Sequence, residues 1–218
     1  IDTLNPTLIV NVDTNDVFVA HFIEDPFVPI ISKIVFSEIN YNSSDTLDAG
    51  DWVEILNIDM TGIDLTSWIF KDVDNNHEFV LPPETFLDTG QYLVICRDTT
   101  KFRALYPDSI HCVGPFEFGL ANEGDQLRLF DTSGMLVVSM TYSNLPPWPT
   151  DADGTGKTIE LLDPQADLNN GSNWFSGCIG GSPGGPYIAC DTININENSE
   201  GTKQVRIYPN PSNEVVFI

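Results

Sequence analysis

The chain has 218 residues, of which 32 are acidic and 9 basic, and 41% are hydrophobic. A net charge of −23 excludes routine nucleic-acid binding, because the phosphate backbone is itself a polyanion and no basic stripe is present to release its counterions. No apolar run approaches the roughly 20 residues of a membrane-spanning helix, so we expect no transmembrane segment. Because the chain begins at Ile1 without a methionine and stops in an apolar run at Ile218, we expect it to be part of a longer protein.

Residues 1–29 are expected to stand apart from the rest of the chain. Two apolar runs, 8–12 and 17–22, flank turn-forming residues at 13–16 and predict a hairpin that ends by Pro29. We interpret this segment as a hairpin or as the tail of an upstream domain.

Residues 30–190 show the alternation that is typical of half-buried strands. In 126–130, for example, alternate side chains face opposite sides of a pleated strand. Segments rich in Asp, Asn and Gly separate such runs and supply turns. About nine strands at this spacing predict an all-β fold and favour a β-sandwich. The runs are 34–41, 52–57, 65–70, 78–81, 92–96, 110–113, 126–130, 136–142 and 158–162.

One short helix is expected after residue 98. Thr99 and Thr100 are expected to cap it, and Pro107 stops it. Phe102, Leu105 and Tyr106 share its apolar face. It is too short to change the fold class.

Four cysteines in an acidic, helix-poor chain predict disulfides and an oxidising compartment. Three pairings are possible. We favour the local one, Cys96 with Cys112 and Cys178 with Cys190, because the first pair lies in successive strands and the second brackets a glycine-rich loop. Each bridge would contribute about 2 to 4 kcal/mol. The alternative, a zinc site, lacks a C-x-x-C pair and a nearby histidine.

Two glycine-rich segments resemble phosphate-binding loops without the required context. Segment 154–158 ends in Gly-Lys-Thr, but Asp151 stands where the first glycine of such a loop belongs, and a strand is expected to follow instead of a helix. Segment 180–185 contains Pro183 and also lacks a following helix, so we interpret it as a turn.

No local catalytic pattern is present in the sequence. Neither H-E-x-x-H nor G-x-S-x-G occurs, and the three histidines lie far apart, at His21, His77 and His111. An enzyme would need distant acids, such as Glu38, Glu54 and Glu160, to converge on a cleft as a carboxylate pair. Because these acids lie inside predicted strands, we expect them to face outward into solvent, and we expect no catalytic activity.

Short acidic loops are candidates for calcium, which prefers six to eight oxygen ligands. The better candidate is loop 151–154, in which Asp151 and Asp153 stand at alternate positions, and the second is 72–76. Neither continues into an EF-hand loop. A solvated acidic turn is the alternative interpretation of both, and apart from calcium we expect no cofactor.

A series of short motifs follows between Ile34 and Tyr187. They are S-E-I-N-Y at 37–41, D-W-V-E-I-L-N at 51–57, D-L-T-S-W at 64–68, L-A-N-E-G-D at 120–125, W-P at 148–149, the stretch 154–161, Trp174 and G-G-S-P-G at 180–184. In this order they resemble the lamin-tail domain of nuclear lamins and of many bacterial extracellular proteins. The resemblance implies an immunoglobulin-like β-sandwich that serves as an accessory module of secreted or surface enzymes. The acidity of the chain speaks against the chromatin association of the nuclear members.

The tryptophans are expected to play different roles. Trp52, Trp68 and Trp174 match motif positions and are expected in the core. Trp148 is the candidate for ligand contact, because flanking prolines keep it in a loop and sugar-binding faces stack on exposed aromatic rings.

The end of the chain changes character. Residues 191–204 have the polar composition of a linker. After it, Tyr208, Pro209, Asn210 and Pro211 resemble the start of the C-terminal sorting domain of type IX secretion, here a truncated one at 205–218. This resemblance implies contact with the type IX secretion machinery. It places the protein outside a Gram-negative bacterium, secreted or on its outer-membrane surface. A proline-containing edge strand is the alternative.

These expectations favour a non-catalytic extracellular accessory or adhesion-type module of a larger bacterial protein. Its loops would contact a glycan or a surface protein. Two alternatives stay open, a calcium-stabilised structural stalk and a carbohydrate-binding module attached to an enzyme.

Overall fold

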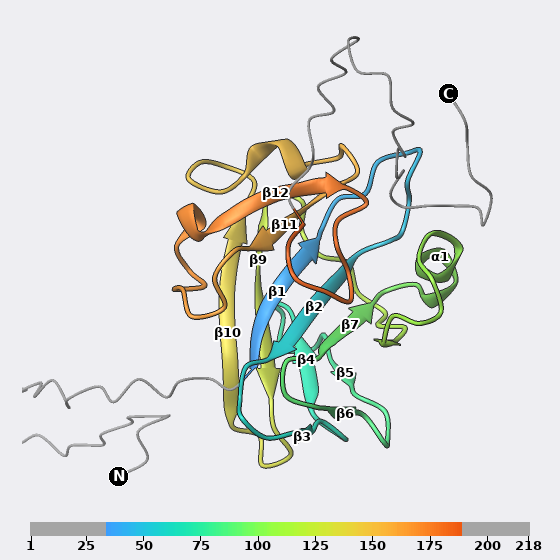
Figure 1. The fold of residues 1–218 in the computed structure, drawn as a ribbon, viewed down its shortest axis with the longest axis vertical. Coiled ribbons are helices and arrows are strands. Elements are labelled where there is room, and N and C mark those ends of the chain that lie inside the picture. Colours follow the sequence, from blue (N-terminus) through green and yellow to red (C-terminus); the bar gives the residue numbers. More distant parts are fainter. Residues whose placement is uncertain (1–33, 189–218) are drawn as a thin grey trace, which may run out of the picture. The chain divides into compact units, whose positions relative to one another are not determined.

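Two β-sheets pack face to face in the computed structural model, which describes residues 34–188 (Figure 1). The larger sheet has, in spatial order, β12 (Trp174–Ile179), β11 (Lys157–Leu161), β1 (Ile34–Asn40), β2 (Trp52–Asn57), β7 (Tyr92–Cys96) and β8 (Cys112–Val113). The smaller sheet has β10 (Leu136–Ser143), β9 (Gly124–Phe130), β4 (Ile69–Lys71) and β5 (Phe79–Val80). A separate pair is formed by β3 (Ile63–Asp64) and β6 (Phe86–Leu87). The predicted all-β, immunoglobulin-like sandwich is confirmed.

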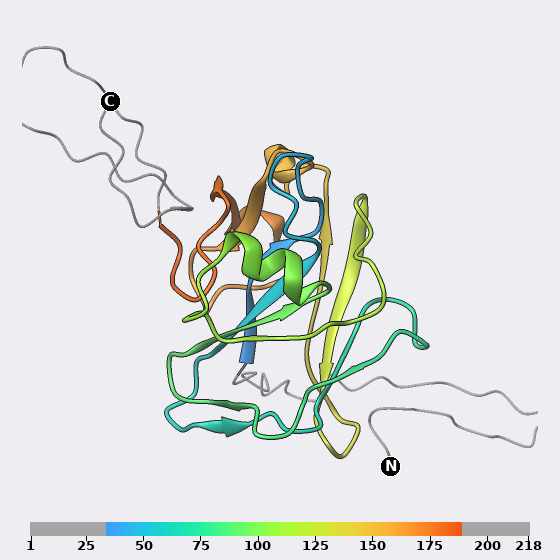
Figure 2. The ribbon, with the colours of Figure 1, turned by 90° about the vertical axis from the view of Figure 1, so that its right-hand side faces the viewer.

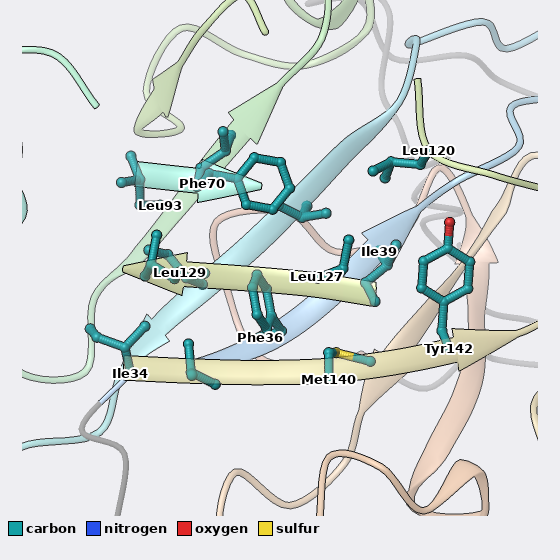
Figure 3. Close-up of a cluster of buried hydrophobic side chains, with 14 of the residues drawn as sticks. Ile34, Phe36, Ile39, Phe70, Leu93, Leu120, Leu127, Leu129, Met140 and Tyr142 are labelled. Carbon is teal, nitrogen blue, oxygen red and sulfur yellow. The ribbon is translucent and has the colours of Figure 1, made fainter. Parts of the chain in front are cut away.

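The core lies between the two sheets. Side chains of β1 face those of β9 and β10 across it (Figure 3). The rings of Phe36 on β1 and Phe70 on β4, 6.4 Å apart, join the sheets directly. The labelled core residues in Figure 3 are Ile34, Phe36, Ile39, Phe70, Leu93, Leu120, Leu127, Leu129, Met140 and Tyr142.

The central strands β1 and β2 are buried on both faces, so the larger sheet has a second covering layer. One part of this layer is α1 (Thr99–Leu105). The rings of Phe102 in this helix and of Tyr106 directly after it pack edge-on against the ring of Trp52. The other part is the segment after β12, drawn in orange-red, which crosses in front of β1 and β2 in Figure 1. Figure 2 shows this segment on one side of β1 and β2 and the yellow strands β9 and β10 on the other.

Several predicted strands differ in their bounds from those observed. Only the last two residues of the predicted strand at 65–70 lie in a strand, β4. Before them the chain turns between β3 and β4, because Thr66 donates its N–H to the Asp64 carboxylate and Ser67 has a φ of 64°. Strand β12 was not predicted, because its sequence lacks a strict alternation of apolar and polar residues.

The predicted helix is present with a different cap. Asp98, not Thr99 or Thr100, is the N-cap, and its carboxylate accepts hydrogen bonds from the N–H groups of Thr100 and Lys101. Two 3₁₀ turns follow later, η1 (Thr150–Ala152) and η2 (Gly171–Asn173).

Four expectations lie outside the described residues: the hairpin at 1–29, Cys190, the linker at 191–204 and the sorting segment at 205–218. Within 34–188, no helix has the length and hydropathy needed to span a bilayer.

Candidate functional site

Three glutamates lie side by side across the larger sheet. Glu38 on β1 pairs in register with Glu160 on β11 and, on its other side, with Glu54 on β2. All three are buried, with exposed fractions of 1%, 2% and 1% respectively. The expectation that these acids face solvent is therefore wrong. They do point away from the core between the sheets, but a second layer of the chain covers them. We call them the glutamate cluster.

The cover is the segment 180–187, which we call the covering loop. The backbone N–H of Ser182 donates to Glu38 Oε1 at 3.0 Å, and its hydroxyl donates to Glu160 Oε2 at 2.5 Å. The N–H of Gly184 donates to Glu54 Oε2. Each carboxyl group of the cluster thus accepts a hydrogen bond from the covering loop.

Hydroxyl groups of the larger sheet donate further hydrogen bonds to the carboxyl oxygens of the cluster. Ser37 Oγ donates to Glu54 Oε1 at 2.7 Å, and Thr158 Oγ1 donates to Glu160 Oε1 at 3.1 Å. Glu38 Oε2 is buried without a hydrogen-bond partner. An ionised oxygen in that position would be costly, because it is buried and accepts no hydrogen bond from the described residues.

Two glycines allow this close approach of backbone to carboxyl groups. A Cβ atom on Gly177 would lie 1.8 Å from Glu160 Oε1, and one on Gly181 would lie 1.9 Å from Glu38 Oε1. Gly181 also has a φ of +63°. The glycine-rich run is a turn, as predicted, and its lack of side chains lets it reach the cluster.

The surroundings raise the pKa of all three carboxyl groups. Burial is the main cause for each, and for Glu38 the charges of Glu160 and Glu54 add to it, raising its pKa well above the usual value. The pKa of Glu54 rises to about 8. None of the ion pairs found in residues 34–188 involves these acids. Burial therefore favours the protonated form of these carboxyl groups.

Neighbouring carboxyl groups of this kind could act as an acid–base pair, but the cavity beside them is too small for a substrate. The remaining cavity is about 80 Å³, lined by the three acids, Tyr92 and Tyr187 among others. Binding pockets for small molecules usually hold at least about 300 Å³. The acids do converge, as the enzyme hypothesis requires, but the closed arrangement suits proton binding better than hydrolysis of a sugar or peptide.

A larger hollow of about 670 Å³ lies elsewhere, where the loop after β1 meets the start of α1. Two ion pairs line it, Arg97 with Asp51 at 3.0 Å and Lys101 with Asp48. Asp51 also accepts the N–H of Leu120 at 3.0 Å, which fixes its carboxylate. The remaining lining residues are Asn42, Ser43, Ser44, Asp45, Gly50, Asp98, Pro115, Phe116 and Glu117. We call this the polar hollow.

Of the two predicted cysteine pairs, one, Cys96 and Cys112, lies wholly within the described residues, and its two members are neighbours. Cys96 Sγ and Cys112 Sγ lie 2.7 Å apart on the adjacent parallel strands β7 and β8, as free thiols. The bridge between them stays a prediction. Cys178 is disulfide-bonded, and Cys190, its predicted partner, lies outside the described residues.

The predicted calcium ligands have protein partners. Asp151 pairs with Lys157 at 2.7 Å, and Asp153 accepts hydrogen bonds from Asn42 at 2.6 Å and Asn144 at 3.2 Å. In the part of the chain that the structure describes, no three acidic, cysteine or histidine side chains are arranged to hold a metal ion. Calcium binding stays a prediction, and a calorimetric titration with Asp153→Asn as the control tests it.

The second acidic loop is held together by its own contacts. Asp72 accepts the N–H of Asp74 at 2.8 Å and pairs with His77 at 2.7 Å, which raises the histidine pKa. Arg128 donates to the Asp72 carbonyl. Among the candidate histidines, His77 thus has a structural role in this loop.

Trp148 is buried, with an exposed fraction of 9%, and this corrects the expectation of an exposed ring. Its ring lies 5.8 Å from that of Trp174, and a Cβ atom on Gly171 would come within 2.9 Å of it. Trp52 and Trp174 are core residues and Trp68 packs against the core, as predicted. Trp148 therefore offers little ring surface to a ligand.

Comparison with known proteins identifies the family. The family model described as Lamin Tail Domain matches residues 29–144, which include Glu38, Glu54 and the polar hollow. No curated protein matches the chain. Strands β11 and β12 and the covering loop follow the matched span. Because the match covers more than half of the 218 residues, and because the fold is an immunoglobulin-like sandwich, the chain belongs to the lamin tail domain family.

Proposed function

We propose that this chain is a non-catalytic extracellular accessory module of a larger secreted or surface bacterial protein, and that it binds a glycan in the polar hollow. The observation that carries the proposal is the lining of that hollow, which combines amide, hydroxyl, carboxylate and basic groups on a rigid sandwich. Sugars present many hydroxyl groups, which donate to carboxylates and accept from ammonium and guanidinium groups. The volume of about 670 Å³ is that of a small-molecule pocket.

The absence of a catalytic role is part of the proposal. Glu38, Glu54 and Glu160, whose pKa values are raised, lie under the covering loop, and His77 pairs with Asp72 in a surface turn. Burial also raises the pKa of Asp51 in the polar hollow, where Arg97 and the N–H of Leu120 hold its carboxylate. Of the acids that line the polar hollow, Asp48 and Asp51 pair with basic residues, and Asp98 caps α1. This arrangement favours recognition over proton transfer to a substrate.

Two observations support export of the protein from the cell, the disulfide bond of Cys178 and the motif that begins at Tyr208. Disulfide bonds persist in oxidising compartments, and Cys178 is disulfide-bonded. Tyr208 and Pro209 begin the motif that resembles a type IX sorting signal. The full-length gene, expressed in a host with type IX secretion, is expected to reach the cell surface only when the segment from Val205 onward is present. Equal surface display without that segment would contradict this part of the proposal.

The binding test is a glycan array followed by titration of the best ligand. Lys101→Ala removes a basic group of the polar hollow, and we expect it to weaken binding about tenfold or more, or roughly 1.4 kcal/mol. Lys71→Ala is the matched control, because Lys71 also pairs with an acid, Glu78, but lies outside the hollow. Absence of any bound glycan, or equal losses in both variants, would overturn the proposal. Binding of a surface protein in place of a glycan would do so too.

A further inference from the structure

We infer that Glu38, Glu54 and Glu160 form a proton-controlled latch, which holds the covering loop on the sheet while the acids are protonated and releases it when they ionise. The inference rests on the register that places these acids side by side and on the hydrogen bonds they accept from Ser182 and Gly184. It is independent of what the polar hollow binds.

The protonated cluster can stay closed because it carries no net charge. On ionisation each O–H bond breaks, the proton passes to water, and up to three negative charges remain under the loop. Glu38 Oε2 then has no donor to stabilise it, and no ion pair in the described residues reaches the cluster. Charges of one sign in a buried site repel one another strongly.

One effect acts in the opposite direction. An ionised carboxylate accepts an N–H hydrogen bond more strongly than a neutral acid does, so the bonds from Ser182 and Gly184 favour ionisation. Burial and mutual repulsion outweigh those bonds, since the pKa of each of the three acids is raised and not lowered. Movement of the loop away from the sheet relieves this cost, because it exposes the carboxylates to bulk water.

The other titratable groups around the cluster are tyrosines. Tyr92 on β7 lines the same cavity, Tyr106 follows α1, and Tyr187 belongs to the covering loop. Burial and the nearby glutamates raise the pKa of Tyr92 and Tyr106, so these two phenols stay neutral where the acids ionise. Strand β12 contributes Gly177, which does not titrate. As the pH rises, the glutamates therefore ionise before Tyr92 and Tyr106.

Hydrogen bonds hold the first residue of the covering loop, Gly180, in place, so the loop can move from the next residue onward. The Gly180 N–H donates to the Gly156 carbonyl at 2.7 Å, and the Gly180 carbonyl accepts the Tyr106 hydroxyl at 2.8 Å. The next residues are held on the sheet by their hydrogen bonds to the glutamates. Release would therefore begin after Gly180, with β12 still paired to β11.

The test measures the loop and the acids on the full chain. Millisecond hydrogen exchange, corrected for the intrinsic effect of pH, reports the protection of the Ser182 and Gly184 amides. We expect protection to fall about tenfold or more between roughly pH 6 and pH 9. In the triple variant Glu38→Gln, Glu54→Gln, Glu160→Gln, which is neutral at every pH, protection should not change over this range. Glu123→Gln, an acid outside the cluster, is the control and should behave as the wild type does.

Carbon-13 NMR of the glutamate side-chain carboxyls makes the test independent of whether the triple variant folds. The wild-type cluster should lose its protons in the same pH range in which Ser182 and Gly184 lose protection. Titration of all three acids near the ordinary value of about 4.3 would overturn the latch. Protection that does not change with pH in the wild type, or that falls equally in the triple variant, would overturn it as well.

Discussion

The backbone N–H of Ser182 donates a 3.0 Å hydrogen bond to Glu38, which lies 144 residues earlier in the chain. This contact joins the last described loop to the first strand of the sheet and closes the cavity above the glutamate cluster. A carboxyl group of a central strand thus accepts a hydrogen bond from a segment that follows the span matched by the family model.

Removing one acid from the cluster should change how stability depends on pH. The pKa of Glu54 in the folded protein, about 8, lies above its usual value of 4.5. The folded state then binds more protons than the unfolded state between these values. The stabilisation is fully present below about pH 4.5 and is lost as the pH rises toward about 8. Denaturant unfolding across this range should show a smaller decline for Glu54→Gln than for the wild type. An unchanged decline would contradict the raised pKa.

Adding a methyl group to Gly181 should displace the covering loop. Gly181→Ala introduces a Cβ atom 1.9 Å from Glu38 Oε1, at a φ of +63°. Gly134→Ala is the matched control, with a φ of +80° and open space around the position. Both variants bear the cost of the left-handed backbone, about 1 kcal/mol, and only the first bears the clash. Unfolding free energies should therefore fall more for Gly181→Ala, and equal losses would show that the loop is not tightly seated.

Truncating Trp148 should reduce stability. Because the ring is buried against Trp174, Trp148→Ala is expected to cost about 3 to 5 kcal/mol in unfolding free energy. Met60→Ala serves as the control, since Met60 is 92% exposed and its truncation should cost less than about 0.5 kcal/mol. A stable Trp148→Ala protein would contradict the structural role of this ring.

The thiols of Cys96 and Cys112 should form a bridge in the protein isolated from an oxidising environment. Their sulfur atoms already lie 2.7 Å apart on adjacent strands. Peptide mapping under non-reducing conditions should recover the two cysteines in one linked pair, and Cys112→Ser should lower stability by about 2 to 4 kcal/mol. Free thiols, or a link from either residue to Cys178, would contradict the local pairing.

The sequence alone determined the fold class and much of the larger sheet. Strands β2 and β7 have the predicted bounds, because apolar runs bounded by turn residues depend on local chemistry. The helix after Asp98 was also predictable from its apolar face and from Pro107.

Only the tertiary structure decided the environment of the glutamates. Alternation along β1 shows which side chains leave the core, but it does not show whether the other face meets water or protein. Here the covering loop, far along the chain, lies over Glu38 and Glu160. Burial and register depend on contacts between distant segments, and these contacts convert three ordinary strand acids into one proton-binding cluster.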